Sequence, residues 1–205
     1  CLLLYASPRN ERNDMSFPWQ GERQDYYIPM INFDTVESGL YRSGFPLARN
    51  MPFIRKLGIR TILFIEPDQS KKIYTKEMDE RCKAEGIQFL YLPLEVNLFP
   101  NDPSRVNRSL EAILSILLDR RNYPILINCL KGQHYTGILV ACIRRLQQWS
   151  MTSIMMEFSH FEKKIRVYDM VLVELFKIHL DVDPSFLPSW MSLDQYNEVK
   201  ALMQS

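Results

Sequence analysis

The sequence has almost no net charge and no long run of hydrophobic residues. Its 205 residues include 25 Lys and Arg against 24 Asp and Glu, so the formal net charge is only +1. Proteins that bind nucleic acid usually carry a strong basic excess, so we expect no nucleic-acid partner. No apolar stretch approaches the roughly 20 residues that cross a bilayer, so we also expect no membrane association.

Cysteine is scarce, and its spacing is irregular. The four cysteines stand at positions 1, 82, 129 and 142. They form no CxxC pair and no spacing typical of a metal site. Scattered cysteines of this kind are typical of a reducing compartment, which predicts a cytoplasmic protein.

Short apolar runs alternate with helical patterns through the middle of the chain. Strands are expected at 39–44, 61–65, 88–92 and 124–128, and helices at 51–57, 71–85 and 103–117. Continuous apolar runs indicate strands that are buried on both faces. Their alternation with helices predicts an α/β fold, in which helices flank a central, mainly parallel sheet. Two more helices, at 150–161 and 167–180, predict a helical C-terminal part.

Length and composition predict one domain with an extension at each end. Residues 1–25 lack periodicity and are expected to form a flexible arm. The domain is expected at 26–180, and the extension 181–205 contains a last helix that follows the capping box Ser192–Gln195. One face of that helix carries Leu193, Tyr196, Val199 and Met203. This face either docks a partner or packs on the domain itself.

A cysteine stands at the head of a short loop between an apolar strand and a helix. Residues 128–137 read Asn-Cys-Leu-Lys-Gly-Gln-His-Tyr-Thr-Gly. The amides of such a loop and the N-terminus of the following helix point at one spot and form an anion cradle. The same field favours a thiolate at Cys129. The alternative is that Cys129 is a small buried hydrophobic residue at the end of a strand.

Three segments together resemble the plant and fungal atypical dual-specificity phosphatases. They are the block 123–161 around the cysteine loop and the blocks 40–46 and 164–169. The resemblance is closest to the fungal branch named for oxidant-induced cell-cycle arrest, which links the chain to stress response. It implies a single cysteine-phosphatase domain that needs no metal and no cofactor. Active members form a cysteinyl-phosphate that water releases, and some remove a phosphate from inositol pyrophosphates.

The resemblance assigns roles to the residues of the loop. The family's loop reads His-Cys-x-x-Gly-Lys-His-Arg-Thr-Gly, which makes Cys129 the nucleophile position. The residues expected to bind phosphate are Leu130, Lys131, Gly132, Gln133, His134, Tyr135 and Thr136.

Three positions depart from the family's loop. Asn128 stands in place of His, Gln133 in place of Lys, and Tyr135 in place of Arg. The arginine matters most, because a guanidinium donates two parallel hydrogen bonds to phosphate and keeps its charge. Such an arginine contributes roughly 10³–10⁵ in rate, which is about 4–7 kcal/mol. We expect the Tyr135 ring to pack over or into the phosphate pocket.

The general acid and the outer contacts are less clearly marked. Asp102 or Glu95 could face the cradle as the general acid, or could be a helix cap and a solvated side chain. Arg42, Lys164 and Arg166 lie in the matched blocks and could contact a polyanion. Each of the three could equally be a surface charge or part of a structural ion pair.

These features predict a catalytically impaired phosphatase-like protein. It would bind sister phosphatase-family proteins in a hetero-oligomer, or a phosphorylated small molecule or phosphoprotein. The alternative is an active atypical cysteine phosphatase on phosphotyrosine or inositol pyrophosphate. A third hypothesis is an interaction module that has lost ligand binding.

Overall fold

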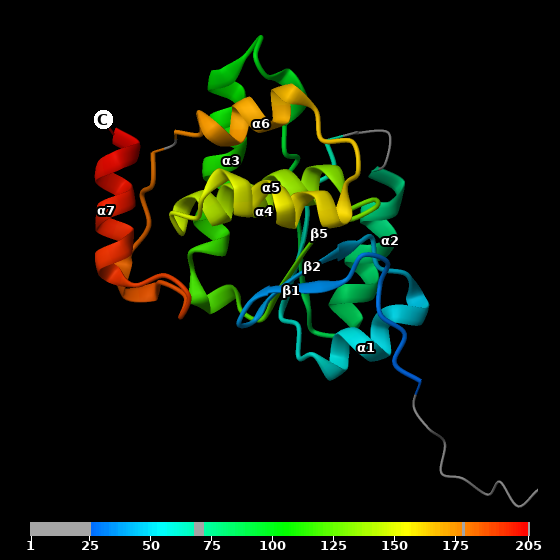
Figure 1. Cartoon of the computed structure of the whole chain (residues 1–205). Coiled ribbons are helices and arrows are strands. Elements are labelled where there is room, and N and C mark those ends of the chain that lie inside the picture. The colour runs from blue at the N-terminus through cyan, green and yellow to red at the C-terminus, as the bar shows by residue number, and fades with distance from the viewer. Residues whose placement is uncertain (1–25, 68–71, 178, 205) are drawn as a thin grey trace, which may run out of the picture.

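A five-stranded sheet forms the centre of the computed structural model, which describes residues 26–67, 72–177 and 179–204. Helices surround this sheet (Figure 1). The strands are β1 (Asp34–Glu37), β2 (Leu40–Gly44), β3 (Thr61–Phe64), β4 (Gln88–Tyr91) and β5 (Ile125–Cys129). Their order in the sheet is β1-β2-β5-β3-β4, and β1 alone runs antiparallel to its neighbour. The predicted α/β class with a mainly parallel sheet is therefore confirmed. The predicted arm, residues 1–25, lies outside the described residues.

Helices cover both faces of the sheet (Figure 1). They are α1 (Met51–Lys56), α2 (Lys72–Ala84), α3 (Pro103–Leu117), α4 (His134–Leu146), α5 (Met151–Phe161), α6 (Val167–Glu174) and α7 (Leu193–Gln204). One core cluster joins residues of α1 and α2 to one face of the sheet. A larger cluster joins residues of α3, α4, α5, α6 and α7 to the other face.

Strand β5 runs through the middle of both cores. Leu126 belongs to the core beside α1 and α2, whereas Ile125 and Ile127 belong to the larger core. All three side chains are fully buried, as the continuous apolar run predicted. A central strand that is packed on both faces gives Cys129, its last residue, a rigid base.

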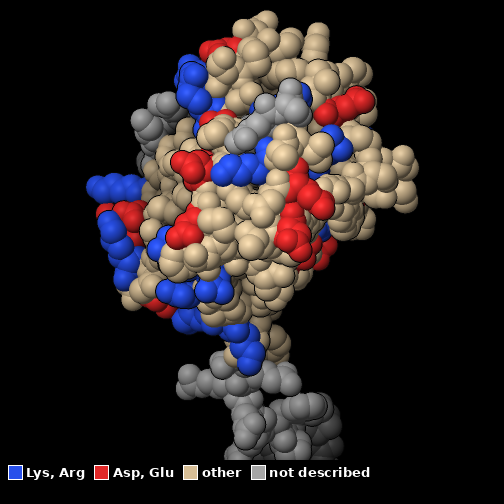
Figure 2. Space-filling model, turned by 90° about the vertical axis from the view of Figure 1, so that its left-hand side faces the viewer, with Lys and Arg blue, Asp and Glu red and all other residues tan. Residues whose placement is uncertain are grey.

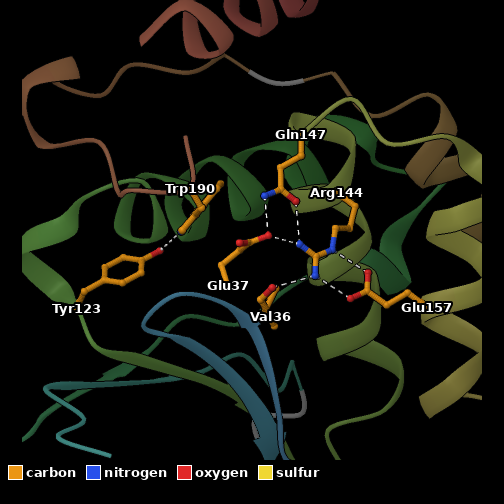
Figure 3. A network of polar contacts seen from close by, with 7 residues as sticks. All are labelled: Val36, Glu37, Tyr123, Arg144, Gln147, Glu157 and Trp190. Atoms are coloured by element: carbon orange, nitrogen blue, oxygen red, sulfur yellow. Dashed lines mark hydrogen bonds and ion pairs between the residues drawn. The ribbon is translucent and has the colours of Figure 1, made fainter. Parts of the chain in front are cut away.

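A buried arginine fixes helix α4 to its surroundings (Figure 3). Both edges of the Arg144 guanidinium are engaged, with Nε and Nη2 donating to the carboxylate of Glu157 on α5, each at 2.8 Å. Arg144 also binds Glu37 at the end of β1, at 2.5 Å, and the carbonyl of Val36, at 2.9 Å. Burial alone would lower the pKa of Arg144, but Glu157 and Glu37 outweigh it and raise that pKa. The helix that follows the cysteine loop is thereby tied to the sheet and to α5.

Helix α7 packs on the body of the domain. Tyr196 and Val199 are 1% and 2% exposed, and the Tyr196 hydroxyl donates to the carbonyls of Leu180 and Val182. Leu193, by contrast, is 53% exposed. The face that carries α7 shows basic and acidic side chains side by side, among many uncharged ones (Figure 2).

Two predictions of secondary structure were incomplete or wrong. The helix expected at 167–180 ends at Glu174, because the chain buries Phe176 and Leu180 in an irregular segment and not on a helix. Apolar residues at helical spacing suit either arrangement. Strand β1 was not predicted, because it has only four residues, is mostly polar and contains an irregular register.

Candidate functional site

Cys129 lies at the carboxyl edge of the sheet, between the ends of β2 and β3. The strand register pairs Cys129 with Gly44, and Asn128 with Phe64. Ligand sites of α/β proteins form outside the carboxyl ends of parallel strands. The Cys129 side chain is 3% exposed and lines a pocket of about 270 Å³.

The Cys129 thiol has a hydroxyl partner on the next helix. The Oγ1 of Thr136, in the first turn of α4, donates to the Cys129 Sγ at 3.1 Å, and Thr136 is fully buried. Gln133 precedes the helix, and its carbonyl accepts the amide of Gly137 at 2.7 Å. The positive end of α4 therefore begins beside the thiol and favours an anion there.

The middle of the loop rests on strand β2. Gly132 has a φ of +69°, and a Cβ built on it would lie 2.4 Å from the Gly44 nitrogen, so only glycine fits this approach. The Arg42 Nη2 donates to the carbonyl of Gly132 at 2.8 Å, and the Arg42 guanidinium stacks 3.5 Å from the centre of the Phe161 ring. Burial lowers the pKa of Arg42 to about 10, with Glu157 and Cys129 acting in the opposite sense. Arg42 thus supports the loop from behind.

The first amide of the loop already donates its hydrogen bond to a carboxylate. The Leu130 N–H donates to Oε2 of Glu66 at 3.2 Å, and the Leu130 carbonyl accepts the amide of Phe45 at 3.1 Å. Glu66 is 7% exposed and lines the same pocket as Cys129. Lys131, the next residue, is exposed. One donor of the predicted anion cradle is thus already bound to an anion of the chain itself.

Tyr135 forms part of the pocket wall, together with Cys129 and Glu66. Its ring is partly buried and meets the His134 ring edge-on, with 4.8 Å between the ring centres. Burial raises the pKa of the Tyr135 hydroxyl, and Glu66 raises it further, whereas Arg166 acts to lower it. Tyr135 is therefore a neutral side chain in the wall of the pocket.

His134 is held by an aspartate from the last part of the domain. Its Nε2 lies 2.9 Å from Oδ2 of Asp169, which also accepts the amide of Arg166 at 3.2 Å. Arg166 lines the pocket, as does Glu162. The charged groups that line the pocket thus include two carboxylates, of Glu66 and Glu162, beside the cations Lys131 and Arg166.

The other proposed site residues lie elsewhere. Asp102 caps α3, since its Oδ1 accepts the Arg105 amide at 3.0 Å, and Glu95 forms an ion pair with the Arg105 side chain at 2.6 Å. Neither carboxylate is among the residues that line the Cys129 pocket. Lys164 is exposed, and it does not line this pocket either. A role for Asp102 as general acid and for Lys164 as a polyanion contact stays a prediction.

Asn128 is buried beneath the loop. Its Nδ2 lies 3.4 Å from the Leu63 carbonyl, a long hydrogen bond. Within the described residues, its Oδ1 has no hydrogen-bond partner. Asn128 thus makes one weak contact to β3 and brings no charge to the thiol.

Glu66 and Glu162 were not predicted from the sequence to lie in the site. Glu66 follows an apolar strand, and a polar residue at the carboxyl end of a parallel strand is a usable signal. Glu162 lies just after α5 and carries no comparable signal. In the described part of the chain, no group of three or more His, Cys, Asp or Glu side chains could hold a metal ion. No helix there is both long and apolar enough to cross a membrane.

The fold and the site together define a class of protein. A cysteine at the end of a central parallel strand is followed by a tight loop and a helix, and a buried hydroxyl contacts the thiol. This arrangement is that of the cysteine-dependent phosphatases, which transfer a phosphoryl group to a thiolate.

The chain belongs to the tyrosine phosphatase family, whose sequence pattern matches residues 27–194. It is 38% identical over 152 residues to the inositol diphosphatase DSP1 of Oryza sativa subsp. japonica, across 74% of this chain and 66% of that protein. It is 32% identical over 178 residues to the putative tyrosine-protein phosphatase OCA1 of Scheffersomyces stipitis, across 80% of this chain and 84% of that protein.

A solved structure supports the same assignment. The core catalytic domain of the PP-IP phosphatase SIW14 from S. cerevisiae, in complex with citrate, is 34% identical and superposes with a TM-score of 0.65. The match covers 74% of this chain and 89% of that chain. Plant inositol diphosphatases and fungal OCA1 proteins are therefore both relatives of this chain.

Proposed function

We propose that this chain binds a phosphorylated ligand at the Cys129 pocket, turns it over very slowly, and acts as a binding or regulatory subunit of related phosphatase-family proteins. The observation that carries the proposal is Tyr135 in the wall of that pocket. The proposed nucleophile Cys129 has its Thr136 contact, and Gly132 makes the tight turn of the loop. What differs is the group that would hold the transferred phosphoryl oxygens.

The size of the deficit follows from the chemistry of phosphoryl transfer. The three equatorial oxygens share the developing charge, and an arginine stabilises it with two parallel N–H donors. Tyr135 offers one hydroxyl that stays neutral, because burial and Glu66 raise its pKa. An arginine contributes roughly 10³–10⁵ in rate in comparable enzymes, so its replacement is sufficient to remove useful turnover while loop amides still bind an anion.

The ligand class is suggested by the relatives. Proteins named as inositol diphosphatases match this chain over most of its length, so inositol pyrophosphates are one candidate ligand. A phosphotyrosine protein is the other, since the family is that of tyrosine phosphatases. We place the chain in the fungal branch on its loop flanks, and in the cytoplasm because Cys82, Cys129 and Cys142 are unpaired.

An active phosphatase is the second candidate. The Thr136 hydroxyl lies 3.1 Å from the Cys129 sulfur, an arrangement that stabilises a thiolate nucleophile. Lys131, His134 or Arg42 would have to supply the missing charge. Lys131 and His134 line the pocket, whereas the described hydrogen bond of Arg42 goes to the Gly132 carbonyl behind the loop. This contact favours a supporting role for Arg42.

Measured turnover separates the two candidates. The purified chain, Tyr135→Arg, Tyr135→Lys and Cys129→Ser would be assayed on p-nitrophenyl phosphate, a phosphotyrosine peptide and an inositol pyrophosphate. We expect Tyr135→Arg to raise turnover at least 100-fold and Tyr135→Lys much less, because lysine lacks the planar fork. Turnover of the unmodified chain within tenfold of an arginine-bearing relative, and abolished by Cys129→Ser, would establish the active enzyme instead.

The partner claim has its own measurement. The chain would be mixed with a sister phosphatase-family protein and examined by sedimentation. A hetero-oligomer that changes the partner's turnover supports a regulatory subunit. Two independent species at micromolar concentration contradict it.

A further inference from the structure

The Glu66 carboxylate stands where an oxyanion ligand would find its first donor. Leu130 directly follows Cys129, so its N–H is the amide nearest the thiol along the loop. That N–H donates to Glu66 Oε2 at 3.2 Å. An incoming phosphoryl group must share or replace this bond, and it must approach a carboxylate that is only 7% exposed.

Burial makes the charge of Glu66 effective. A carboxylate at the surface is screened by water and salt, whereas a buried one acts through a low effective dielectric constant. The charge of Glu162 on the same pocket has the same sign, and Lys131 and Arg166 together only balance the pair. Among the described residues that line the pocket, the side chains of Lys131 and Arg166 therefore leave no net positive charge to attract the further negative charges of a polyanion.

We propose that Glu66 is a specificity-determining residue that limits the pocket to ligands with one phosphoryl group and disfavours polyanions such as inositol pyrophosphates. The inference rests on the proposed function, since it assumes that the Cys129 pocket binds phosphorylated ligands. It narrows the ligand class to phosphate monoesters. The alternative is that Glu66 only ties the end of β3 to the loop, in which case its charge has no effect on ligand preference.

Protection of Cys129 from iodoacetamide measures binding without any need for turnover. Cys82 and Cys142 are fully buried and serve as internal references in the same mass spectrum. Phenyl phosphate is the probe with one phosphoryl group, and inositol hexakisphosphate is the polyanion. For the unmodified chain, we expect phenyl phosphate to protect at the lower concentration.

The variants separate charge from structure. Glu66→Gln keeps the shape of the side chain and removes its charge, so we expect the affinity for inositol hexakisphosphate to rise at least tenfold and that for phenyl phosphate to rise less than threefold. Glu66→Asp keeps the charge and should keep the preference for the monoester. Glu162→Gln removes a pocket charge whose described amide partner is Lys164 and not a residue of the cysteine loop, and it should have a smaller effect. Glu85→Gln removes a carboxylate that pairs with Arg55 and is not among the residues that line the pocket, and it controls for net charge.

Each outcome decides the proposal. An unchanged ratio of the two affinities in Glu66→Gln, or an equal gain in Glu162→Gln, overturns the role of Glu66 while ligand binding itself stands. A preference of the unmodified chain for inositol hexakisphosphate also overturns it. Protection by neither probe, in the unmodified chain and in Glu66→Gln alike, refutes the proposed ligand binding and with it the inference.

Discussion

Replacing Arg144 by methionine is expected to destabilise the whole domain. The Arg144 side chain is 5% exposed and bridges Glu157, Glu37 and the Val36 carbonyl. Its guanidinium also lies 4.3 Å from the centre of the Trp149 ring. Methionine preserves much of the side-chain volume but leaves two carboxylates without their cation (Figure 3).

The magnitude follows from burial. Breaking one partner out of a buried ion pair costs about 3–5 kcal/mol. The side chains of Glu37 and Glu157 are 24% and 25% exposed, so water can solvate them partly once Arg144 is gone. We therefore expect the low end, about 3 kcal/mol, which for a domain of this size lowers the melting temperature by roughly 6–12 °C.

Urea denaturation followed by circular dichroism gives the free energy of unfolding. The matched control is Arg121→Met, because Arg121 pairs with Asp119 on the surface and is 62% exposed. Such a pair contributes at most about 1 kcal/mol. Adding Glu157→Gln to Arg144→Met should restore part of the loss, since it removes one stranded charge. A loss below about 1 kcal/mol for Arg144→Met, or one equal to that of the control, refutes the reasoning.

Two further predictions concern the loop and alkaline pH. Gly132→Ala should lower the free energy of unfolding by about 3 kcal/mol. The strain of a left-handed φ adds to the clash of a Cβ that would lie 2.4 Å from the Gly44 nitrogen. Gly58→Ala, with a φ of +66° and nothing within 4 Å of its Cβ, should cost only about 1 kcal/mol, and equal losses on urea denaturation would contradict the close approach. Burial raises the pKa of Cys82 from 9.0 to about 11, so the unfolded chain ionises first and stability falls as pH rises from 9 to 11. At 1.36 kcal/mol per pKa unit, the loss is about 2–3 kcal/mol. Cys82→Ala should flatten that decline in urea titrations at pH 8 to 11, and parallel curves would show that the thiol is not the cause.

The elements with strong apolar patterns could be predicted from the sequence. The run at 61–65 and the run at 124–128 became strands buried on both faces, as expected. Secondary structure could not be predicted where a segment was short or where its pattern suited more than one structure. Strand β1 is stabilised by its pairing with β2, which no local pattern encodes. Helix α6 ends where it does because Phe176 enters the core from an irregular segment, and the spacing of the apolar residues alone does not reveal this.

The contacts inside the cysteine loop were determined by the sequence alone. Cys129, Gly132 and Thr136 stand along the chain at the spacing that led to the prediction of the phosphatase family, and the family match confirms that family. The reason is that Cys129 and Thr136, whose side chains form a hydrogen bond, lie only seven residues apart, so the local geometry of the loop brings them together.

What surrounds the loop was decided only by the tertiary structure. Glu66 and Leu130 are 64 residues apart, and they meet because Phe64 on β3 pairs with Asn128 on β5. The pairing of Gly44 with Cys129 likewise brings Arg42 under the loop, 90 residues from its partner Gly132. Strand register is set by the packing of both faces of the sheet. A single sequence therefore shows that a phosphatase loop is present, while the charges that the loop faces are fixed by the fold.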